Sequence, residues 1–391
     1  MIATLVAPRL MRVGAGAVAE LAAVLATLGL RRPLVVTDPY MVSSGLLRRC
    51  LDPLEAAGIT ADVFSATVPE PTDTVIEAGV ARLAGHDCLV AFGGGSPIDT
   101  AKAIAILAAG RARGAGDAMR DYKVPVQNDA PALPVIAIPT TAGTGSEATR
   151  FTVITDTARG EKMLIAGLAA LPLAALVDYE LTFSVPPRIT ADTGVDSLTH
   201  ALEAYVSRRA NPYADTQALA AMALIGAHLR TAYTVPGDRP ARAAMMLGAM
   251  QAGIAFTNSS VALVHGMSRP IGARFHVPHG LSNAMLLPAV TRFGLGEAPV
   301  RYAVAARTIG FADAGDSDAV AGEKLVTGLI ALNADLAVPS PRAYGIDPAE
   351  WEAALPGMAE QALASGSPGN NPRVPDAGEI VGLYRAVFGL M

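Results

Sequence analysis

One stretch decides the fold of the first half of the chain: Cys88-Leu89-Val90-Ala91-Phe92-Gly93-Gly94-Gly95-Ser96-Pro97-Ile98-Asp99-Thr100-Ala101-Lys102. Its apolar start predicts a buried β-strand, and the glycines that follow let the backbone approach a ligand closely. Ser96 is then the expected helix N-cap, with Pro97 at the first helical position and Asp99 completing a capping pattern. Such a helix start attracts phosphate oxygens, although a tight strand–helix turn without a ligand explains the glycines equally well.

Similar apolar runs alternate with Ala-rich helical stretches up to residue 186. The predicted strands are Pro33–Asp38, Ala61–Phe64, Cys88–Phe92, Pro134–Pro139 and Ala174–Asp178. Apolar strands separated by helices predict a parallel sheet that is covered on both faces. The Gly- and Arg-rich stretch Gly110–Gly116 is expected to be an exposed loop.

After Pro186-Pro187 the strand pattern almost vanishes. Long helices are predicted over Asp196–Arg208, Asn211–Thr231 and Ala241–Ala255. The sequence therefore predicts an α/β domain over residues 1–186 and an all-helical domain over residues 187–391.

A second glycine-rich turn follows the predicted strand Pro134–Pro139. It is Thr140-Thr141-Ala142-Gly143-Thr144-Gly145-Ser146-Glu147, whose hydroxyls and glycines can line a cofactor channel. Neither turn has the Gly-x-Gly-x-x-Gly fingerprint or the Gly-Lys-Ser/Thr ending of a P-loop, so hydrolysis of a nucleoside triphosphate is not expected.

Asp196 and His200 are four residues apart in a predicted helix, so their side chains lie on one face, one turn apart. His265 and His279 follow, at the ends of a Gly- and Pro-containing stretch that can bring two more imidazoles to the same point. One carboxylate oxygen and three imidazole nitrogens suit Fe²⁺, Zn²⁺, Co²⁺ or Ni²⁺, and do not suit Ca²⁺ or Mg²⁺. A lone Asp-x-x-x-His pair is often only a surface hydrogen bond, but this group holds three of the six histidines.

Composition excludes several classes of protein. The net charge of −5 without a basic block argues against a nucleic-acid-binding surface. Cys50 and Cys88 are too few for a disulfide framework, which predicts a reducing, cytoplasmic location. The N-terminus lacks a signal-peptide pattern, and no apolar run approaches the ~20 residues of a membrane span, so no membrane partner is expected.

The two turns are followed by two further motifs and a short late one. These are Asp192-Thr193-Gly194-x-Asp196-Ser197-Leu198-Thr199-His200-Ala201-x-Glu203, His265-Gly266-Met267 through Pro278-His279-Gly280, and Asn371-Pro372-Arg373. In this order the motifs resemble the iron-containing (group III) alcohol dehydrogenase family of the dehydroquinate synthase-like superfamily, over essentially the whole chain. The resemblance implies a Rossmann-like nucleotide-binding domain, a helical domain, a catalytic divalent metal in the cleft between them, and a homodimer.

The resemblance also implies roles for single residues. Asp196, His200, His265 and His279 each match a metal ligand, with Fe²⁺ as the expected metal and Zn²⁺ or another ion as the alternative. The implied cofactor-binding positions are Gly93, Gly94, Gly95, Ser96, Asp99, Thr140, Thr141, Thr144 and Lys162. The implied activity is hydride transfer between NAD(H) and a short-chain alcohol, aldehyde or ketone.

Asp38 ends the predicted strand Pro33–Asp38, where the adenosine ribose would lie in this fold. A carboxylate there accepts hydrogen bonds from the ribose and repels a 2′-phosphate, which predicts a preference for NAD(H) over NADP(H). The alternative is an Asx turn, because Pro39 follows.

Arg269 departs from the family pattern, since many alcohol-oxidising relatives have a histidine four residues after the third metal ligand. Arginine stays protonated and does not easily shuttle a proton; His276 is the candidate substitute. If its segment is helical, Arg269 lies one turn after His265, where its planar donors suit a substrate with a carboxylate, sulfonate or phosphonate. The alternatives are an ion pair with a carboxylate such as Glu203, or a contact with the cofactor pyrophosphate.

Three other functions stay open. The chain also fits a zinc-dependent polyol (glycerol-type) dehydrogenase of the same superfamily. A dehydroquinate synthase-like lyase is disfavoured because the helical half lacks the expected Lys- and Arg-rich pocket. A catalytically silent metal- and nucleotide-binding protein is disfavoured by the intact set of four ligands.

Overall fold

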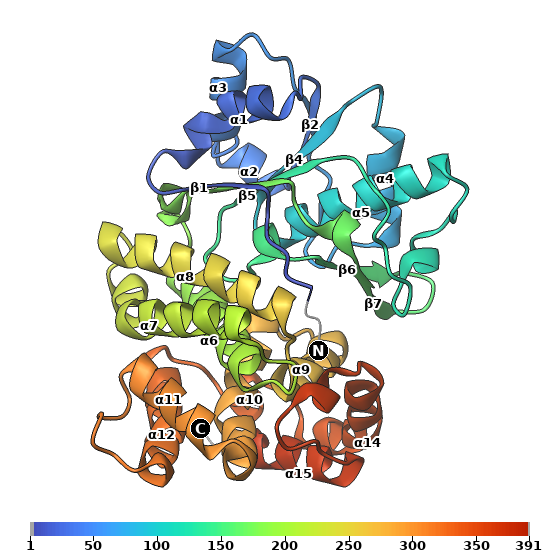
Figure 1. The fold of residues 1–391 in the computed structure, drawn as a ribbon. Helices are drawn as coiled ribbons and strands as arrows, with labels where there is room; N and C mark the ends of the chain where they lie inside the picture. Colours follow the sequence, from blue (N-terminus) through green and yellow to red (C-terminus); the bar gives the residue numbers. More distant parts are fainter. Residues whose placement is uncertain (1–3, 390–391) are drawn as a thin grey trace. The chain divides into compact units, whose positions relative to one another are not determined.

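The computed structural model describes residues 4–389 and divides into two units. One unit is Val6–Ser184, and the other runs from Val185 towards the C-terminus and includes residues 4 and 5 (Figure 1). The division lies close to the change of sequence pattern at residue 186.

The unit Val6–Ser184 is built on a six-stranded sheet with the order β1-β8-β5-β4-β2-β3. Every neighbouring pair in this sheet is parallel. The strands are β1 (Leu10–Val13), β2 (Pro33–Val36), β3 (Asp62–Phe64), β4 (Cys88–Gly93), β5 (Val135–Pro139) and β8 (Ala174–Val177). The predicted parallel sheet is confirmed, and the ends of the five predicted strands differ from the observed ones by only one or two residues.

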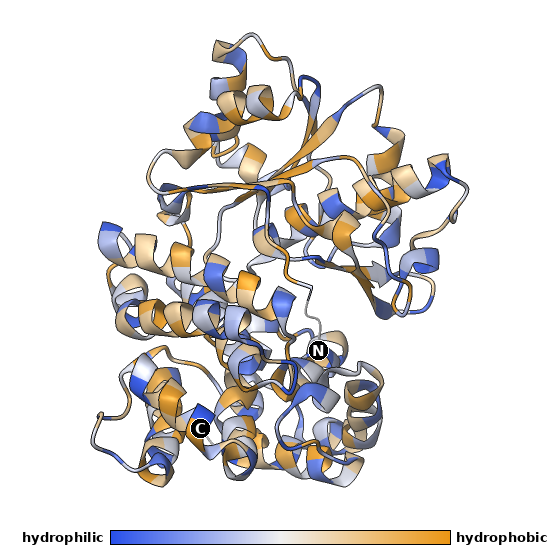
Figure 2. Cartoon of the chain, viewed as in Figure 1, coloured by the Kyte–Doolittle hydropathy of each residue, from blue (hydrophilic) through white to orange (hydrophobic). Residues whose placement is uncertain are grey.

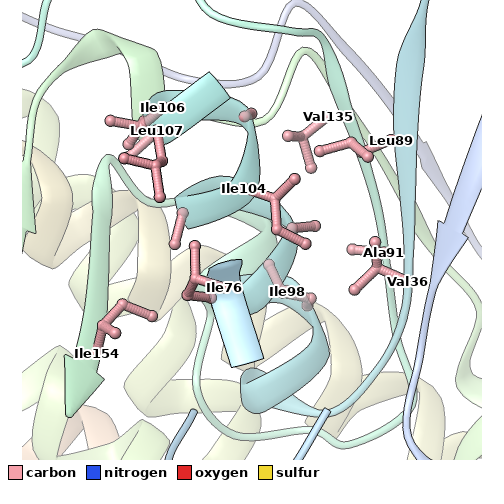
Figure 3. Packing of buried hydrophobic residues seen from close by; sticks show 14 of the residues in the cluster. Val36, Ile76, Leu89, Ala91, Ile98, Ile104, Ile106, Leu107, Val135 and Ile154 are labelled. Carbon is pink, nitrogen blue, oxygen red and sulfur yellow. The ribbon is translucent and has the colours of Figure 1, made fainter. Parts of the chain in front are cut away.

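Helices cover both faces of this sheet. They are α1 (Leu21–Leu28), α2 (Pro39–Ser43), α3 (Arg48–Ala56), α4 (Asp73–Ala81) and α5 (Gly95–Ala112). Successive side chains of a strand point to opposite faces. Val36 and Leu89 therefore enter the core under α4 and α5 (Figure 3), whereas Val35 and Val90 enter the core under α1 and α3. This alternation makes β2 and β4 apolar throughout (Figure 2).

Two features of this unit differ from the sequence expectation. The first is an unpredicted antiparallel hairpin of β6 (Phe151–Asp156) and β7 (Glu161–Ala166). The second is that Gly110–Gly116 is not entirely loop, because α5 continues to Ala112. Gly110 is buried there, and a side chain at this position would collide with the Tyr122 hydroxyl.

The second unit is helical, and its described residues contain no strand. Its helices are α6 (Pro187–Val206), α7 (Pro212–Thr234), α8 (Arg239–Asn258), α9 (Leu263–Phe275), α10 (His279–Gly294), α11 (Pro299–Ile309), α12 (Asp318–Asp335), α13 (Pro341–Tyr344), α14 (Pro348–Ala364) and α15 (Ala377–Phe388). The three predicted helices are present as α6, α7 and α8, with different ends. Thus α6 starts at Pro187, which suits a first helical turn, and stops at Val206, two residues before the predicted end.

Short 3₁₀ helices complete the structure. They are η1 (Ala17–Glu20), η2 (Met119–Tyr122), η3 (Ser146–Ala148), η4 (Leu168–Ala170), η5 (Tyr179–Thr182), η6 (Leu295–Glu297) and η7 (Ser367–Asn370). Within residues 4–389, no single helix is long and apolar enough to cross a membrane. The pair α8 and α9, bent by 105°, meets that test by length and composition only.

Candidate functional site

The four predicted metal ligands converge on one point in the helical unit. Their ligand atoms, one carboxylate oxygen and three imidazole nitrogens, all lie within 4.8 Å of one another. Asp196 Oδ1 is 3.5 Å from His265 Nε2 and 3.8 Å from the Nε2 atoms of His200 and His279. Three of the residues are buried, and His279 keeps 41% of its side chain exposed. The cluster is therefore open on the side of one ligand.

Three helices bring these side chains together. Asp196 and His200 share one face of α6, while His265 lies in the first turn of α9 and His279 is the first residue of α10. Gly280 allows α10 to start against α6, because a Cβ at this position would lie 2.3 Å from the Asp192 carbonyl oxygen.

A buried carboxylate orients one of the imidazoles. Glu203 Oε2 lies 2.7 Å from His265 Nδ1 and also accepts a hydrogen bond from the Ala262 amide, while Oε1 accepts from the Val264 amide at 2.5 Å. This contact places the proton of His265 on Nδ1, which leaves the Nε2 lone pair for a metal. Glu203 also satisfies amides at the start of α9, which no side chain of that helix caps.

Asn283 is a fifth polar residue of the cluster that sequence reasoning missed. Its Nδ2 donates to Asp196 Oδ1 at 2.6 Å and lies 3.2 Å from His265 Nε2 and 3.3 Å from His279 Nε2. The Oδ1 atom of this fully buried amide has no hydrogen-bond partner among the described residues. Asn283 follows His279 by four residues, so the helical spacing that pairs Asp196 with His200 would have indicated it.

The charges of the cluster fit a divalent cation. Burial would raise the pKa of Asp196, but the imidazoles of His200, His279 and His265 outweigh it and lower that pKa well below its usual range. Asp196 is therefore ionised, as a carboxylate that binds a metal must be. A borderline transition metal fits this donor set, and a hard cation such as Mg²⁺ does not.

The two glycine-rich turns meet at the carboxyl ends of β4 and β5 in the α/β unit. Gly93 has φ of 148°, which a side chain would disfavour. A Cβ on Gly95 would come within 2.9 Å of the Thr144 side chain, and one on Gly94 within 3.6 Å of Thr141 Oγ1. The turns are therefore packed directly against each other.

Two features of these turns suit a phosphate-bearing ligand. The helix α5 begins at Gly95 with Gly94 as its N-cap, so no side chain caps its first amides. Thr140 is 1% exposed, and its Oγ1 has no hydrogen-bond partner within the described chain. A ligand hydroxyl or phosphate would satisfy these groups, so the residues fit a nucleotide cofactor.

The predicted capping pattern of α5 is wrong. Ser96 lies inside the first turn, because the helix starts one residue before it. The Asp99 carboxylate does not complete a cap: Oδ1 accepts from Ser146 Oγ at 2.8 Å, and Oδ2 accepts from the Val153 amide at 3.0 Å. Both carboxylate oxygens are thus bonded to the segment that contains the second turn.

The other two predicted cofactor residues have protein partners. Asp38 is the N-cap of α2, since its Oδ1 accepts from the Met41 amide at 2.9 Å; its Oδ2 faces Gly93. The local backbone bond that was the alternative to ribose binding therefore occupies Oδ1 of Asp38. Oδ2 remains beside the first glycine-rich turn. Lys162 lies on β7 and pairs with Glu70.

Arg269 lies on α9 one turn after His265. Its one hydrogen bond among the described residues is from Nη1 to Ser367 Oγ at 3.3 Å, and no carboxylate of the described chain forms an ion pair with it. Glu203 instead binds His265 and two amides. Burial lowers the pKa of Arg269, and the charge of Glu203 opposes that shift. His276, the candidate substitute for proton transfer, is the exposed C-cap of α9 and lies outside the ligand cluster.

A parallel α/β unit with paired glycine-rich turns, together with a helical unit that carries a carboxylate–imidazole cluster, defines a metal-dependent, nucleotide-binding class of enzyme. The model of the iron-containing alcohol dehydrogenase family matches residues 8–179, and its C-terminal model matches residues 190–388. The chain belongs to the iron-containing alcohol dehydrogenase family. It is therefore a metal-dependent NAD(H) oxidoreductase that acts on alcohols or aldehydes.

Individual relatives agree with this assignment. Lactaldehyde reductase of Escherichia coli (strain K12) is 36% identical over 378 residues, which cover 96% of this chain and 97% of that protein. The 1,3-propanediol dehydrogenase of Klebsiella pneumoniae is 36% identical over 366 residues, 92% of each chain.

Solved structures show the same fold. A 1,3-propanediol oxidoreductase superposes with a TM-score of 0.93 at 34% identity, covering 99% of this chain and 100% of that one. Sulfoacetaldehyde reductase from Bifidobacterium kashiwanohense, solved with NAD⁺, gives a TM-score of 0.88 at 28% identity over 100% of both chains. These matches favour the iron-type enzyme over the zinc-dependent polyol dehydrogenase that the sequence left open.

The geometry of the cluster predicts the effect of removing one imidazole. His265→Ala deletes a nitrogen ligand and leaves Glu203 with only its two amide donors, so metal affinity should fall by at least ~10-fold. Metal content after equilibrium dialysis, measured by mass spectrometry, checks this. His276→Ala removes an exposed histidine of the same helix and should keep the full content. A His265→Ala protein with unchanged affinity would contradict the assignment.

A second prediction concerns Glu147, which is 2% exposed beside Lys102. Burial raises the pKa of its carboxyl to about 7 from 4.5, so the folded state favours the neutral form. Burying the neutral carboxyl therefore contributes stability that is fully present below the unfolded pKa of 4.5. This contribution is lost as the pH rises through the folded pKa of about 7. Relative to Glu147→Gln, the free energy of unfolding of the wild type should therefore fall by about 3 kcal/mol between about pH 4.5 and pH 8. Urea unfolding of both proteins across this range measures the difference; a constant difference would show that Glu147 titrates normally.

Proposed function

We propose that the protein interconverts a short-chain alcohol and its aldehyde or ketone with NAD(H), using one Fe²⁺ held by Asp196, His200, His265 and His279. One observation carries this proposal: a carboxylate oxygen and three imidazole nitrogens lie within 4.8 Å of one another in a chain of the iron-containing alcohol dehydrogenase family. Related enzymes named lactaldehyde reductase and 1,3-propanediol dehydrogenase support a small, oxygen-bearing substrate.

The residues around the cluster have distinct tasks in this reaction. A metal bound there supplies Lewis-acid polarisation of the substrate oxygen. Glu203 holds His265 in the tautomer and orientation that a ligand needs, and Asn283 sets the position of Asp196 by its hydrogen bond. The partly exposed side of His279 is where substrate reaches the cluster.

We assign NAD(H) binding to the α/β unit, Val6–Ser184, and metal binding to the helical unit that begins at Val185. Bound NAD(H) supplies or accepts the hydride. The uncapped amides of α5 at Gly95 and Ser96 would bind the pyrophosphate, and Thr140, Thr141 and Thr144 would offer hydroxyls to the adenosine half. A solved relative that contains NAD⁺ supports this cofactor.

The direct test is NADH oxidation with a panel of short aldehydes. Protein prepared without oxygen and loaded with Fe²⁺ should turn over, the same sample after chelation should be inactive, and Fe²⁺ should restore the rate. Zn²⁺ reconstitution is the matched control for the identity of the metal. Full activity in the chelated, metal-free sample would overturn the proposal.

Asp38 is proposed to set the choice between NAD(H) and NADP(H). Its Oδ2, which faces Gly93, can accept from a ribose hydroxyl and would repel a 2′-phosphate. The wild type should strongly prefer NADH, and Asp38→Gly should narrow the ratio of kcat/KM values. Asp38→Asn, which keeps an oxygen able to cap α2, separates charge from the N-cap bond to Met41. Equal efficiency with both cofactors in the wild type would refute this role.

We further propose that the substrate carries an anionic group which Arg269 binds. The support is a guanidinium, one helical turn after His265, that has only a long hydrogen bond to Ser367 among the described residues. A cation that is half-buried is costly to desolvate without an anionic partner, and the carboxylate of Glu203 is already engaged. The similar sulfoacetaldehyde reductase is named for a substrate of this kind.

This substrate class predicts a selective effect of Arg269→Gln. The variant should lose about 1.5–3 kcal/mol of transition-state binding with succinic semialdehyde or a sulfonate-bearing aldehyde, and much less with neutral aldehydes of equal length. Arg274→Gln removes an exposed arginine from the same helix and should change neither rate. An equal loss on neutral and anionic substrates would assign Arg269 to the cofactor or to structure.

We also propose a cytoplasmic homodimer without nucleic-acid or membrane partners. Cys50 and Cys88 are both buried, free thiols, as is usual in a reducing compartment. The net charge of −5 without a basic block speaks against nucleic acid. The dimer follows from the family resemblance, and sedimentation analysis would test it.

A further inference from the structure

A lysine is completely buried in the α/β unit. Lys102 lies on α5 and is 0% exposed, and its Nζ donates to oxygens of three residues. The acceptors are Ser146 Oγ at 3.0 Å, the Thr149 carbonyl at 3.0 Å, Thr149 Oγ1 at 3.2 Å and the Phe151 carbonyl at 2.8 Å. All of them belong to one short segment of the chain, so Lys102 holds that segment rather than a scattered set of groups.

This segment is the far end of the second glycine-rich turn. It runs from Ser146 into β6, whereas α5 starts at the first turn. Asp99, one helical turn before Lys102, binds the same segment through Ser146 Oγ and the Val153 amide. Its carbonyl oxygen also accepts from Thr152 Oγ1 at 3.0 Å. Two charged residues on one face of α5 thus connect the helix of the first turn to the end of the second.

Burial disfavours the charged forms of the ionisable residues in this network. Burial lowers the pKa of Lys102 to about 8, against the attraction of the Asp99 and Glu147 carboxyls. Burial likewise raises the pKa of Asp99 and of Glu147. Buried ionic networks often add little stability compared with an apolar core, but they do fix one geometry.

We propose that Lys102 is a positioning residue for the cofactor, which locks the turn Thr140–Glu147 against the turn Gly93–Gly95. The inference rests on the proposed binding of NAD(H) to these turns. Thr144 and Thr141 pack directly on Gly95 and Gly94, so any movement of the second turn displaces the hydroxyls that would face the cofactor. Lys102 acts on them through the backbone and hydroxyl groups of Ser146 and Thr149.

The test compares three variants of the full-length, metal-loaded protein. Lys102→Met removes the ammonium and keeps most of the volume. Ser146→Ala is milder, because it removes only the hydroxyl between Lys102 and Asp99. Leu107→Ala, on the same helix and fully buried, is a control that destabilises the unit through its core without touching either turn. Each variant is studied well below its unfolding temperature.

NADH binding, measured by fluorescence titration, is the main readout. Lys102→Met should raise Kd by at least ~10-fold and Ser146→Ala by roughly 3-fold, with metal content unchanged. The KM for NADH should rise in parallel while kcat at saturating NADH stays near wild type. Leu107→Ala should keep the wild-type Kd, because destabilisation lowers the fraction of folded molecules and leaves the affinity of the folded ones unchanged.

Two results would overturn the inference. One is a wild-type Kd in Lys102→Met, or in Ser146→Ala if the first variant does not fold. The other is a loss of NADH affinity in Leu107→Ala that equals the loss in the network variants. A wild-type protein that does not bind NADH at all would instead overturn the proposed function, and this inference with it.

Discussion

The Glu203 carboxylate fixes His265, the third candidate ligand, against the helix that carries the first two. This buried carboxylate comes from α6, the helix that carries Asp196 and His200, and it accepts hydrogen bonds from the Ala262 and Val264 amides at the start of α9. It also fixes the proton of His265. A single carboxylate thus positions the third ligand relative to the first two and selects its tautomer. Because the low-dielectric interior strengthens such bonds, the arrangement is rigid without any covalent link.

The α/β unit uses a comparable device. There, Lys102 and Asp99 on α5 bind the segment after the second glycine-rich turn, and the glycines of the first turn remove the side chains that would keep the turns apart. In both units a charged helix residue fixes a stretch of irregular backbone that provides functional groups. Irregular backbone is otherwise the most mobile part of a fold, so such fixation is what a preorganised site requires.

The sequence allowed the sheet, the two-part architecture and the four converging candidate ligands to be predicted. Four of the five predicted strands, β2, β4, β5 and β8, are buried on both faces and are therefore apolar throughout, which is a strong local pattern. The ligands were accessible partly through local spacing, as in Asp196 and His200, and partly through the family resemblance, as in His265 and His279.

The remaining features depend on contacts between distant residues. Lys102 reads as an ordinary helix lysine until its acceptors, 44 to 49 residues away, are brought to it. The edge strand β1 has one hydrogen-bonded neighbour in the sheet and mostly exposed side chains, so it lacks an apolar run. The hairpin strand Phe151–Asp156 alternates between half-buried and buried residues, but its buried positions include Thr152 and Asp156, so its sequence shows no apolar–polar alternation that would predict a strand. The capping of α5 by Ser96 failed because Gly94 already occupies the N-cap position.

Anomalous diffraction at the iron absorption edge tests most directly whether Asp196, His200, His265 and His279 bind one functional metal ion. Crystals of protein loaded with Fe²⁺ without oxygen should give a single strong peak per chain. Asp196, His200, His265 and His279 should each lie roughly 2.0–2.2 Å from that peak. A peak at another site, or a fully active crystal sample without a peak at these residues, would contradict the account.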